Sequence, residues 1–336
     1  PRHLLDAEIA SILSLGIEAH TGVTVGADIC VQELQREYDC LYIAIGAHQD
    51  KKVGIPGEDS TNVMSAVEML RSIGDDVMPD FTGKRVVVIG GGNVAMDVCR
   101  SAVRLGADET YVLYRRSEAE LPADPEEVKE AMEEGVQFRF LTAPVEILGT
   151  DGKVTGIRVE RMVLGEPDEK GRRKPVGTGE FETLAVDSVI GAIGQTVDWG
   201  TLDVGALTTT KKGTAEADAL TYQTAQPDIF VGGDCYTGPK FAIDAIAAGK
   251  EAAISLHRYV HPGQTLTAGR DRRVYKALDK EHVLIETADF DKDHRQMPGY
   301  NAAKAKTFSD ARVTFTEEQV RRECARCLGC GATKVD

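Results

Sequence analysis

Long apolar runs, an excess of basic residues and paired cysteines are all missing from this 336-residue sequence. No run approaches the roughly 20 apolar residues that cross a membrane, and no secretory signal opens the chain, so we expect no membrane association. Acidic side chains outnumber basic ones by 54 to 39, for a net charge of −15. That balance argues against a nucleic-acid partner, which would favour a basic face.

The seven cysteines lack the paired spacing of a disulfide-stabilised secreted protein. Four are scattered, and three crowd the C-terminus as Cys324, Cys327 and Cys330. An odd count without pairing fits a reducing cytoplasm, which is where we expect the protein. Outside the C-terminal cluster the sequence has no CxxC or CxxxxC pair typical of a disulfide reductase, which disfavours that class of enzyme.

The sequence begins at Pro1 rather than Met and enters a helical pattern at once, and it stops just after the cysteine cluster. We interpret it as a piece of a longer polypeptide, with a length that fits about two ordinary domains.

A glycine-rich turn follows a buried strand in "VVVIGGGNVAMD", residues 86–97. A pyrophosphate binds best at a helix N-terminus, where backbone N–H groups lack partners and the helix dipole is positive. Gly90 permits the tight turn, Gly92 permits close approach of the backbone, and the small Ala95 lets the helix pack on the strand. Asn93 can help to hold the turn. The alternative is a glycine turn that binds no ligand, but a strand before it and a helix after it favour dinucleotide binding.

The residues that follow the next strand indicate which nicotinamide cofactor fits. An acidic side chain there would accept hydrogen bonds from the ribose of NAD, whereas this chain has Arg115 and Arg116. Guanidinium groups match a 2′-phosphate in charge and geometry, so we predict NADP rather than NAD. The alternative is that one or both arginines only solvate the end of the strand.

The order of the predicted elements is that of a Rossmann-like α/β fold with an inserted antiparallel meander. We expect strands over 84–90, 110–116 and 136–141, helices over 4–15, 62–73, 93–105 and 125–134, a hairpin around Asp151-Gly152, a returning strand within 179–194, and a strand, a glycine turn and a helix within 226–260. The polar stretch 261–314 is expected to be a tail or linker, and 316–331 resumes a helical pattern.

Four stretches together resemble the flavoproteins that have two dinucleotide-binding domains, and within them the branch of the glutamate synthase small subunit. The stretches are "VVVIGGGNVAMD", "YRRSEAELPA", "AIGQTVDW" and "DIFVGGDCYTGPKFAIDAIAAGKEAA". The resemblance implies an NADP-binding domain over 59–199, which looks complete, and a discontinuous FAD-type domain over 1–58 and 200–260, with a tail over 261–336.

In that family a second nucleotide, FAD, is bound by residues that match Thr224 to Asp234 here. By resemblance, Asp234 contacts the ribityl or pyrophosphate region, Gly233 allows close approach, and the helix that begins near Phe241 aims its positive end at the flavin ring. The alternative is an aspartate that only caps a helix. The family's FAD domain starts with its own glycine turn, which this sequence lacks, so binding of FAD by this chain stays open. The full set of candidate cofactor-binding residues is Gly90, Gly91, Gly92, Asn93, Val94, Ala95, Arg115, Arg116, Gly194, Gln195, Ala44, Gly46, Gly233, Asp234, Phe241 and Ala242.

The C-terminal cysteines have the spacing of ligands to one metal centre. An iron–sulfur cubane needs four soft ligands, and the common run leaves three residues between its third and fourth cysteines, which places Lys334 at the fourth position here. Relatives often carry such clusters. Cys324, Cys327 and Cys330 are therefore candidate ligands of an incomplete site, with free thiols as the alternative.

We read the sequence as an NADPH-dependent flavin oxidoreductase module that passes electrons through FAD to iron–sulfur centres or a partner subunit. No catalytic nucleophile or triad is expected, because hydride transfer needs only close stacking of the two rings. The alternative is an NADP-binding fragment or scaffold that lacks FAD and has no turnover.

Overall fold

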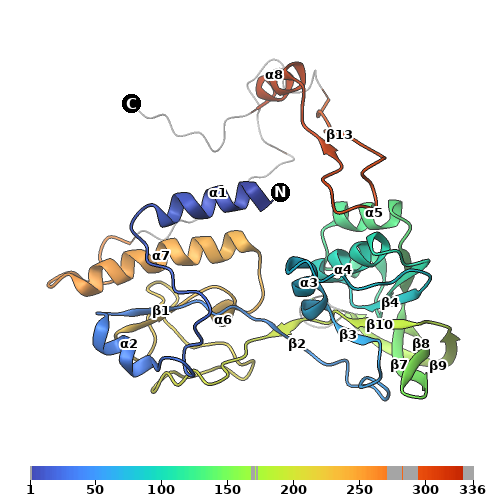
Figure 1. Cartoon of the computed structure of the whole chain (residues 1–336), viewed down its shortest axis with the longest axis horizontal. Helices are drawn as coiled ribbons and strands as arrows, with labels where there is room; N and C mark the ends of the chain where they lie inside the picture. The colour runs from blue at the N-terminus through green and yellow to red at the C-terminus, as the bar shows by residue number, and fades with distance from the viewer. Residues whose placement is uncertain (1, 168–170, 172, 271–281, 283–293, 328–336) are drawn as a thin grey trace. The chain divides into compact units, whose positions relative to one another are not determined.

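The computed structural model describes residues 2–167, 171, 173–270, 282 and 294–327 (Figure 1). It divides into two compact units, Arg2–Ala268 and a smaller one made of Gly269–Asp336 with Pro1. The larger unit contains the α/β fold that the sequence predicts, with separate hydrophobic cores around two parallel sheets.

Five parallel strands form the central sheet, in the order β3-β10-β4-β5-β6. They are β3 (Val63–Ser65), β10 (Ser188–Gly191), β4 (Arg85–Ile89), β5 (Glu109–Tyr114) and β6 (Gln137–Phe140). Strands β5 and β6 follow one another on one side of β4, and the chain then returns to add β10 on the other side of β4. The strand order therefore reverses between β4 and β10, and ligands of open α/β sheets bind outside the carboxyl ends of the strands at such a point.

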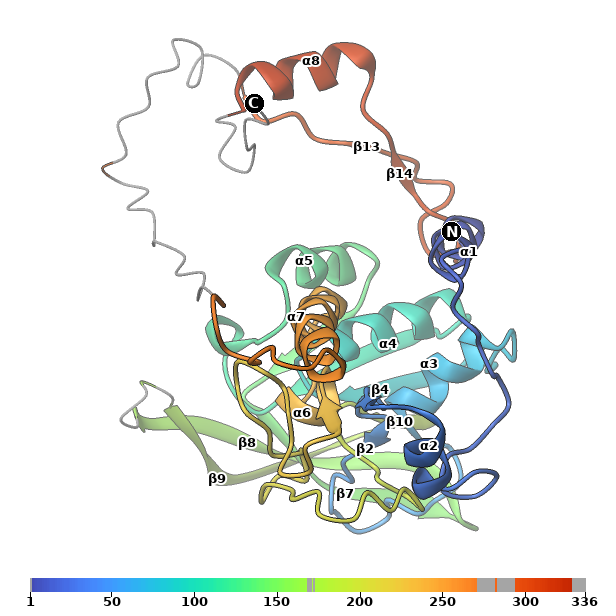
Figure 2. The same ribbon diagram turned by 90° about the vertical axis from the view of Figure 1, so that its left-hand side faces the viewer.

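The central sheet is covered on both faces, as the continuous apolar run of β4 predicts. Helices α3 (Ala66–Gly74), α4 (Asn93–Arg104) and α5 (Pro125–Glu133) cover one face, and the antiparallel meander of β7 (Thr142–Thr150), β8 (Lys153–Pro167) and β9 (Arg173–Leu184) covers the other (Figure 2). Along β4, Val86 and Val88 pack with the helices, whereas Val87 and Ile89 pack with the meander.

The predicted hairpin at Asp151-Gly152 joins β7 to β8, and both residues adopt positive φ angles, 51° and 75°. Such angles at both central positions are typical of the tight turns that match the twist of paired strands.

Two expected elements differ from the structure in their bounds. The helix expected over 62–73 is preceded by a short strand, because the Ser65 side chain accepts a hydrogen bond from the Glu68 N–H at 3.0 Å and starts α3 only at Ala66. The run 179–194 contains the end of β9 and the separate strand β10. Asp187 lies between them and accepts bonds from the backbone and side chain of Arg85, so the chain turns there.

The rest of the larger unit brings together segments from both ends of its sequence. Strand β1 (Leu41–Ile43) pairs in parallel with β12 (Ile229–Val231). Around this pair lie α1 (Arg2–Leu13), α2 (Val31–Glu37), α6 (Asp234–Thr237) and α7 (Ala242–Val260). Two crossings of the chain, β2 (Gln49–Asp50) and β11 (Gln195–Thr196), pair antiparallel between this part and the central sheet.

In the smaller unit, β13 (Gly299–Tyr300) pairs antiparallel with β14 (Arg312–Val313), and α8 (Glu317–Ala325) follows. Thr316 caps α8 by accepting a hydrogen bond from the Gln319 N–H at 3.3 Å, and the Gln319 side chain accepts one from the Thr316 N–H in return. Nowhere in the described ranges is a helix both long enough and apolar enough to cross a membrane.

Candidate cofactor-binding site

The turn between β4 and α4 is made of three glycines, of which the packing of the fold requires the first two. Gly90 has a φ of 144°, and a Cβ there would lie 2.2 Å from the carbonyl oxygen of Ala192. A Cβ on Gly91 would lie 2.6 Å from the ring of Tyr114. The first two glycines are therefore needed to pack the turn against the neighbouring strand ends.

Gly92 has no such neighbour. Its φ and ψ angles, −89° and 178°, suit any residue, and a Cβ on it would meet no atom within 4 Å. Gly92 is the N-cap of α4, and no side chain caps this helix end. The N–H groups of Asn93 and Val94 make no backbone hydrogen bond within the described residues, and both residues line a cavity. Unpaired N–H groups at a helix start are the arrangement that binds phosphate groups.

Asn93 and Ala95, the other two residues predicted to act in this turn, hold it in place through contacts with the rest of the fold. The Asn93 side chain accepts a hydrogen bond from the Asp124 N–H at 2.9 Å, which ties the start of α4 to the start of α5. Ala95 is fully buried in the core between α4 and the sheet, as its predicted packing role requires.

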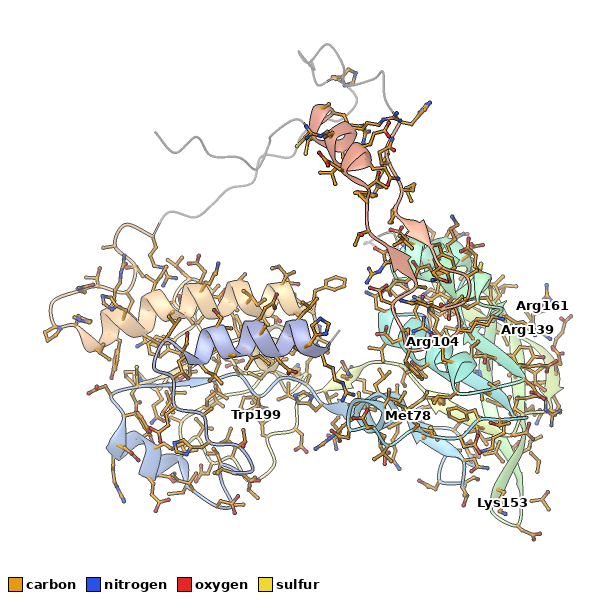
Figure 3. All side chains as sticks on the ribbon, turned by 45° about the horizontal axis from the view of Figure 1, so that its top comes forward. Met78, Arg104, Arg139, Lys153, Arg161 and Trp199 are labelled. Atoms are coloured by element: carbon orange, nitrogen blue, oxygen red, sulfur yellow. The ribbon has the colours of Figure 1, made fainter. Side chains whose placement is uncertain are left out.

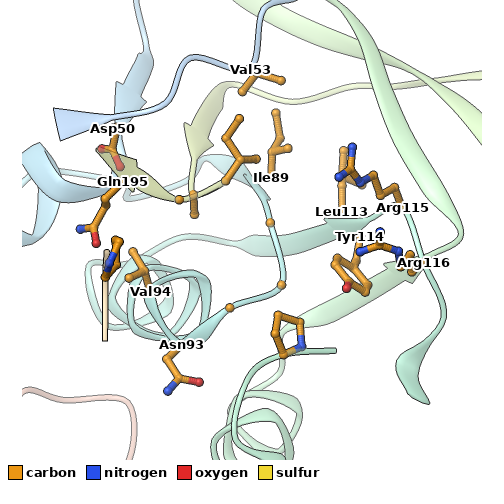
Figure 4. Close-up of a pocket in the computed structure, with 18 of the residues that line it drawn as sticks. Asp50, Val53, Ile89, Asn93, Val94, Leu113, Tyr114, Arg115, Arg116 and Gln195 are labelled. Carbon is orange, nitrogen blue, oxygen red and sulfur yellow. The ribbon is translucent and has the colours of Figure 1, made fainter. Parts of the chain in front are cut away.

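A cavity of about 720 Å³ opens in front of this turn. Ten of the predicted cofactor-binding residues line it: Gly90, Gly91, Gly92, Asn93, Val94, Arg115, Arg116, Gly194, Gln195 and Phe241. Figure 4 shows Arg115 and Arg116 on one side of the cavity, Asp50 and Gln195 on the opposite side, and the beginning of α4 between them. The volume is within the usual range for small-molecule sites, and its length runs across the point where the strand order reverses.

The two arginines stand at the carboxyl end of β5. Arg115 is exposed and makes no hydrogen bond or ion pair within the described residues. Arg116 is half-buried, and its Nε donates to the Arg173 carbonyl oxygen at 3.2 Å. An exposed guanidinium without a partner, at the rim of a cavity in an acidic protein, is suited to bind an anion.

The opposite side of the cavity is held by the antiparallel pair β2–β11. Asp50 accepts hydrogen bonds from the Ser65 hydroxyl and from the Val67 N–H, the latter at 2.9 Å, so its carboxylate fixes β2 to the start of α3. Gln195 lies beside it in β11. Phe241, two-thirds exposed at the N-cap of α7, reaches this cavity from the β1–β12 half.

The remaining predicted cofactor-binding residues do not line this cavity. Ala44, Gly46, Gly233, Asp234 and Ala242 lie instead around the carboxyl ends of β1 and β12 and the start of α7. Asp234 accepts a hydrogen bond from the Lys240 N–H at 3.1 Å, so it braces the loop before α7.

The β1–β12 half fits one part of a flavin site. Gly233 adopts a φ of 67°, and residues 241–247 at the start of α7 are all exposed, with no side chain capping that helix end. Such an uncapped N-terminus favours negative charge. The spacing of Gly90, Gly92 and Ala95 occurs once in the sequence, and the glycine turn that follows β12 does not repeat it.

The cysteines do not form a metal site within the described ranges. Cys324 on α8 and Cys327 just after it are exposed, and Cys330 lies outside the described residues. No group of three or more His, Cys, Asp or Glu side chains in the described part of the chain is placed to hold a metal ion.

Sequence reasoning missed several residues that line the cavity. Pro122 belongs to the quoted stretch "YRRSEAELPA", so that stretch could have pointed to it. Ala143 and Pro144 come from the first strand of the meander, and Asp50 from the crossing strand β2. Nothing in their local sequence marks them, because only the packing of the meander and the crossing strands brings them to the site.

The chain is similar to several known oxidoreductase subunits. It is 38% identical to the beta subunit of the NADP(+)-dependent formate dehydrogenase of Moorella thermoacetica, over 98% of this chain and 48% of that protein. It is 36% identical to the small chain of the NADPH glutamate synthase of Escherichia coli (strain K12), over 71% of this chain and 54% of that protein. The chain thus spans about half the length of these curated relatives.

Among solved structures, Mycobacterium tuberculosis FprA in complex with NADPH has the same fold, with a TM-score of 0.60 and 24% identity over 70% of this chain and 67% of that one. The family model described as pyridine nucleotide-disulphide oxidoreductase matches residues 7–249. Since that match covers most of the chain, including the β4–α4 turn and both crossing strands, the chain belongs to the pyridine nucleotide-disulphide oxidoreductase family.

Proposed function

We propose that this chain binds NADPH in the cavity in front of α4 and presents the nicotinamide to a flavin. The observation that carries the proposal is the open, uncapped start of α4 at Gly92, with the arginines at one end of the same cavity. The pyrophosphate would lie on the N–H groups of α4, and the 2′-phosphate would lie between Arg115 and Arg116. The nicotinamide would then reach the side formed by Gly194 and Gln195.

The choice of NADPH over NADH rests on local charge. The protein as a whole carries a charge of −15, which repels a phosphate, yet Arg115 and Arg116 sit together at the cavity rim. The formate dehydrogenase and glutamate synthase relatives are both named for NADP or NADPH.

The residues of this chain would bind and orient the cofactor rather than supply an acid or a base. Hydride transfer requires the two rings to be held in contact, and no proton has to move through a side chain. When bound, FAD would accept the hydride of NADPH and release electrons singly to an iron–sulfur centre or a partner subunit. Phe241 and the exposed start of α7 lie where the cavity meets the β1–β12 half, and would form the side that faces the flavin.

Iron–sulfur binding and a partner subunit belong to the same proposal. Cys324, Cys327 and Cys330 would supply three thiolates, and a cubane would need a fourth ligand from elsewhere. The formate dehydrogenase relative is named a beta subunit and the glutamate synthase relative a small chain, which supports a partner that receives the electrons. A chain that binds NADPH without holding FAD is the second reading, because this sequence contains one glycine turn of the α4 type where two nucleotides need cradles.

The experiment is a pair of measurements on the purified protein. Calorimetric titrations with NADPH and with NADH should show that NADPH binds more tightly. Replacing Arg115 or Arg116 with Ala should weaken NADPH binding roughly tenfold or more, the scale of one hydrogen bond to a charged group, and leave NADH unchanged. Unchanged NADPH affinity in both variants would refute the 2′-phosphate assignment.

The absorption spectrum separates the two readings. Yellow protein whose flavin bands bleach on addition of NADPH supports the flavin oxidoreductase. Colourless protein that binds NADPH with the same arginine dependence supports the binding module without turnover.

A further inference from the structure

The loop that carries Arg115 and Arg116 is held from outside by the meander. The Arg116 Nε donates to the carbonyl oxygen of Arg173, the first residue of β9 and 57 positions later in the chain, at 3.2 Å. The Arg173 Nε in turn donates to Glu120 Oε1 at 2.8 Å. Arg173 therefore contacts the loop twice, once through its backbone and once through its side chain.

Glu120 is fixed in the same loop by its own hydrogen bonds. Its second carboxylate oxygen accepts from the Ser117 N–H at 3.1 Å and from the Ser117 hydroxyl at 2.9 Å, which closes a capping box around the short turn Glu118–Glu120. The Glu120 side chain is 20% exposed. Its removal from water raises the pKa of Glu120, but the hydrogen bonds from Ser117 and Arg173 outweigh this and hold the pKa below its usual value. The loop that would bind a phosphate thus contains a carboxylate that is charged at neutral pH, although Glu120 does not itself line the cavity.

These contacts have two consequences for the arginines of the site. The Arg116 Nε donates to a carbonyl, and its two terminal nitrogens make no hydrogen bond to any residue that the structure describes. Those two nitrogens would therefore bind a phosphate in the forked geometry of a guanidinium. Because Glu120 is paired with Arg173, its negative charge is compensated locally. Without that pair, the carboxylate would repel a second anion bound in the same loop.

We infer that Arg173 is a positioning residue for the 2′-phosphate, which neutralises Glu120 and holds the Arg115–Arg116 loop in place, so that the meander contributes to the choice of NADP(H) over NAD(H). This inference rests on the proposed function, since it assigns another residue to the same site. Neither Arg173 nor Glu120 lines the cavity, so Arg173 would act through the loop, whereas Ala143 and Pro144 of β7 line the cavity directly. The meander is therefore a wall of the cofactor site as well as the cover of the sheet.

The test compares NADP+ and NAD+ binding by calorimetry in the whole chain, so that neither flavin nor turnover is needed. Arg173→Ala should raise the Kd for NADP+ roughly tenfold, the scale of one hydrogen bond to a charged group, and change the Kd for NAD+ less than twofold. Adding Glu120→Gln to that variant should restore most of the lost NADP+ affinity, because the uncompensated carboxylate is gone. Lys153→Ala is the matched control: it removes a positive charge from the far end of the same meander, where Lys153 lies outside the cavity, and should change neither Kd (Figure 3).

The outcomes separate this inference from the proposed function. Wild-type protein that binds NADP+ no better than NAD+ would overturn the proposed function itself. Wild-type preference for NADP+ that survives Arg173→Ala would overturn only the role of Arg173. Equal weakening of both cofactors with a lowered melting temperature, and no rescue by Glu120→Gln, would assign Arg173 to folding and overturn the inference as well.

Discussion

Replacing Gly92 with Ala should weaken cofactor binding roughly thirtyfold in a protein that folds normally. The backbone of Gly92 has φ and ψ angles that alanine adopts freely, and the added methyl would meet no atom of the protein within 4 Å. The cost to folding is therefore small, less than about 1 kcal/mol for a less favourable N-cap. The methyl would nevertheless stand in the open space in front of α4, where the pyrophosphate is expected.

The magnitude follows from the hydrogen bonds at risk. A phosphate pushed away from the start of α4 loses at least one hydrogen bond to a charged group, about 2 kcal/mol, or roughly thirtyfold in Kd. Calorimetric titration with NADP+ measures this loss, and thermal unfolding followed by circular dichroism measures the stability. Gly74→Ala is the control, because Gly74 at the end of α3 is equally free of neighbours but lies outside the cavity.

Gly90→Ala should behave in the opposite way. Its φ of 144° and the 2.2 Å approach of the Ala192 oxygen force the backbone to move, which we expect to destabilise the fold by about 2 kcal/mol or more. If Gly92→Ala instead binds NADP+ as tightly as wild type while remaining folded, the pyrophosphate does not lie at the start of α4, and the reasoning about this turn is wrong.

Two further predictions concern groups buried around the same sheet. Glu134, of which 4% of the side chain is exposed, accepts hydrogen bonds from Arg100 and Arg104, so Glu134→Gln should lower the free energy of unfolding by roughly 3 kcal/mol in urea titrations at pH 7. Burial raises the pKa of Glu134, but the bonds and charges of the two arginines outweigh it and hold the pKa below its usual value. The loss of unfolding free energy in Glu134→Gln should therefore be complete above the pKa of an unfolded glutamate, about 4.3, and should shrink as the pH falls through the lowered pKa of folded Glu134. A loss that does not change with pH would contradict an ionised Glu134 paired with the two arginines. Burial raises the pKa of the Cys99 thiol to about 12, so iodoacetamide at pH 8 should label exposed Cys30 readily and Cys99 only after unfolding, as peptide mass spectrometry can show. Equal labelling rates in the native protein would disprove the burial of Cys99.

The parts of the site that were predicted from the sequence are those made by one short segment. The run "VVVIGGGNVAMD" contains its own strand, turn and helix start, and this local backbone pattern alone makes it a candidate phosphate-binding turn. Arg115 and Arg116 follow the next strand directly, so their place beside that cradle follows from the parallel pairing of β4 and β5. The bounds of 62–73 and 179–194 were less accurate, because a strand and an adjoining helix or a second strand can share one apolar run.

What the sequence by itself determined is therefore the glycine turn that begins α4, the arginines at the end of β5 and the α/β class, since each depends on contacts between near neighbours in the chain. The tertiary structure decided that the Ala192 carbonyl oxygen leaves no room for a Cβ on residue 90, that Ala143 and Pro144 line the cavity, and that Arg173 contacts Glu120 and Arg116. The contacts of Arg173 join residues 53 and 57 positions apart in the sequence, and the approach of Ala192 to Gly90 joins residues 102 positions apart. Only burial of the sheet's second face by the meander, and the return of β10 beside β4, brings them together, and no local preference of the residues involved encodes that packing.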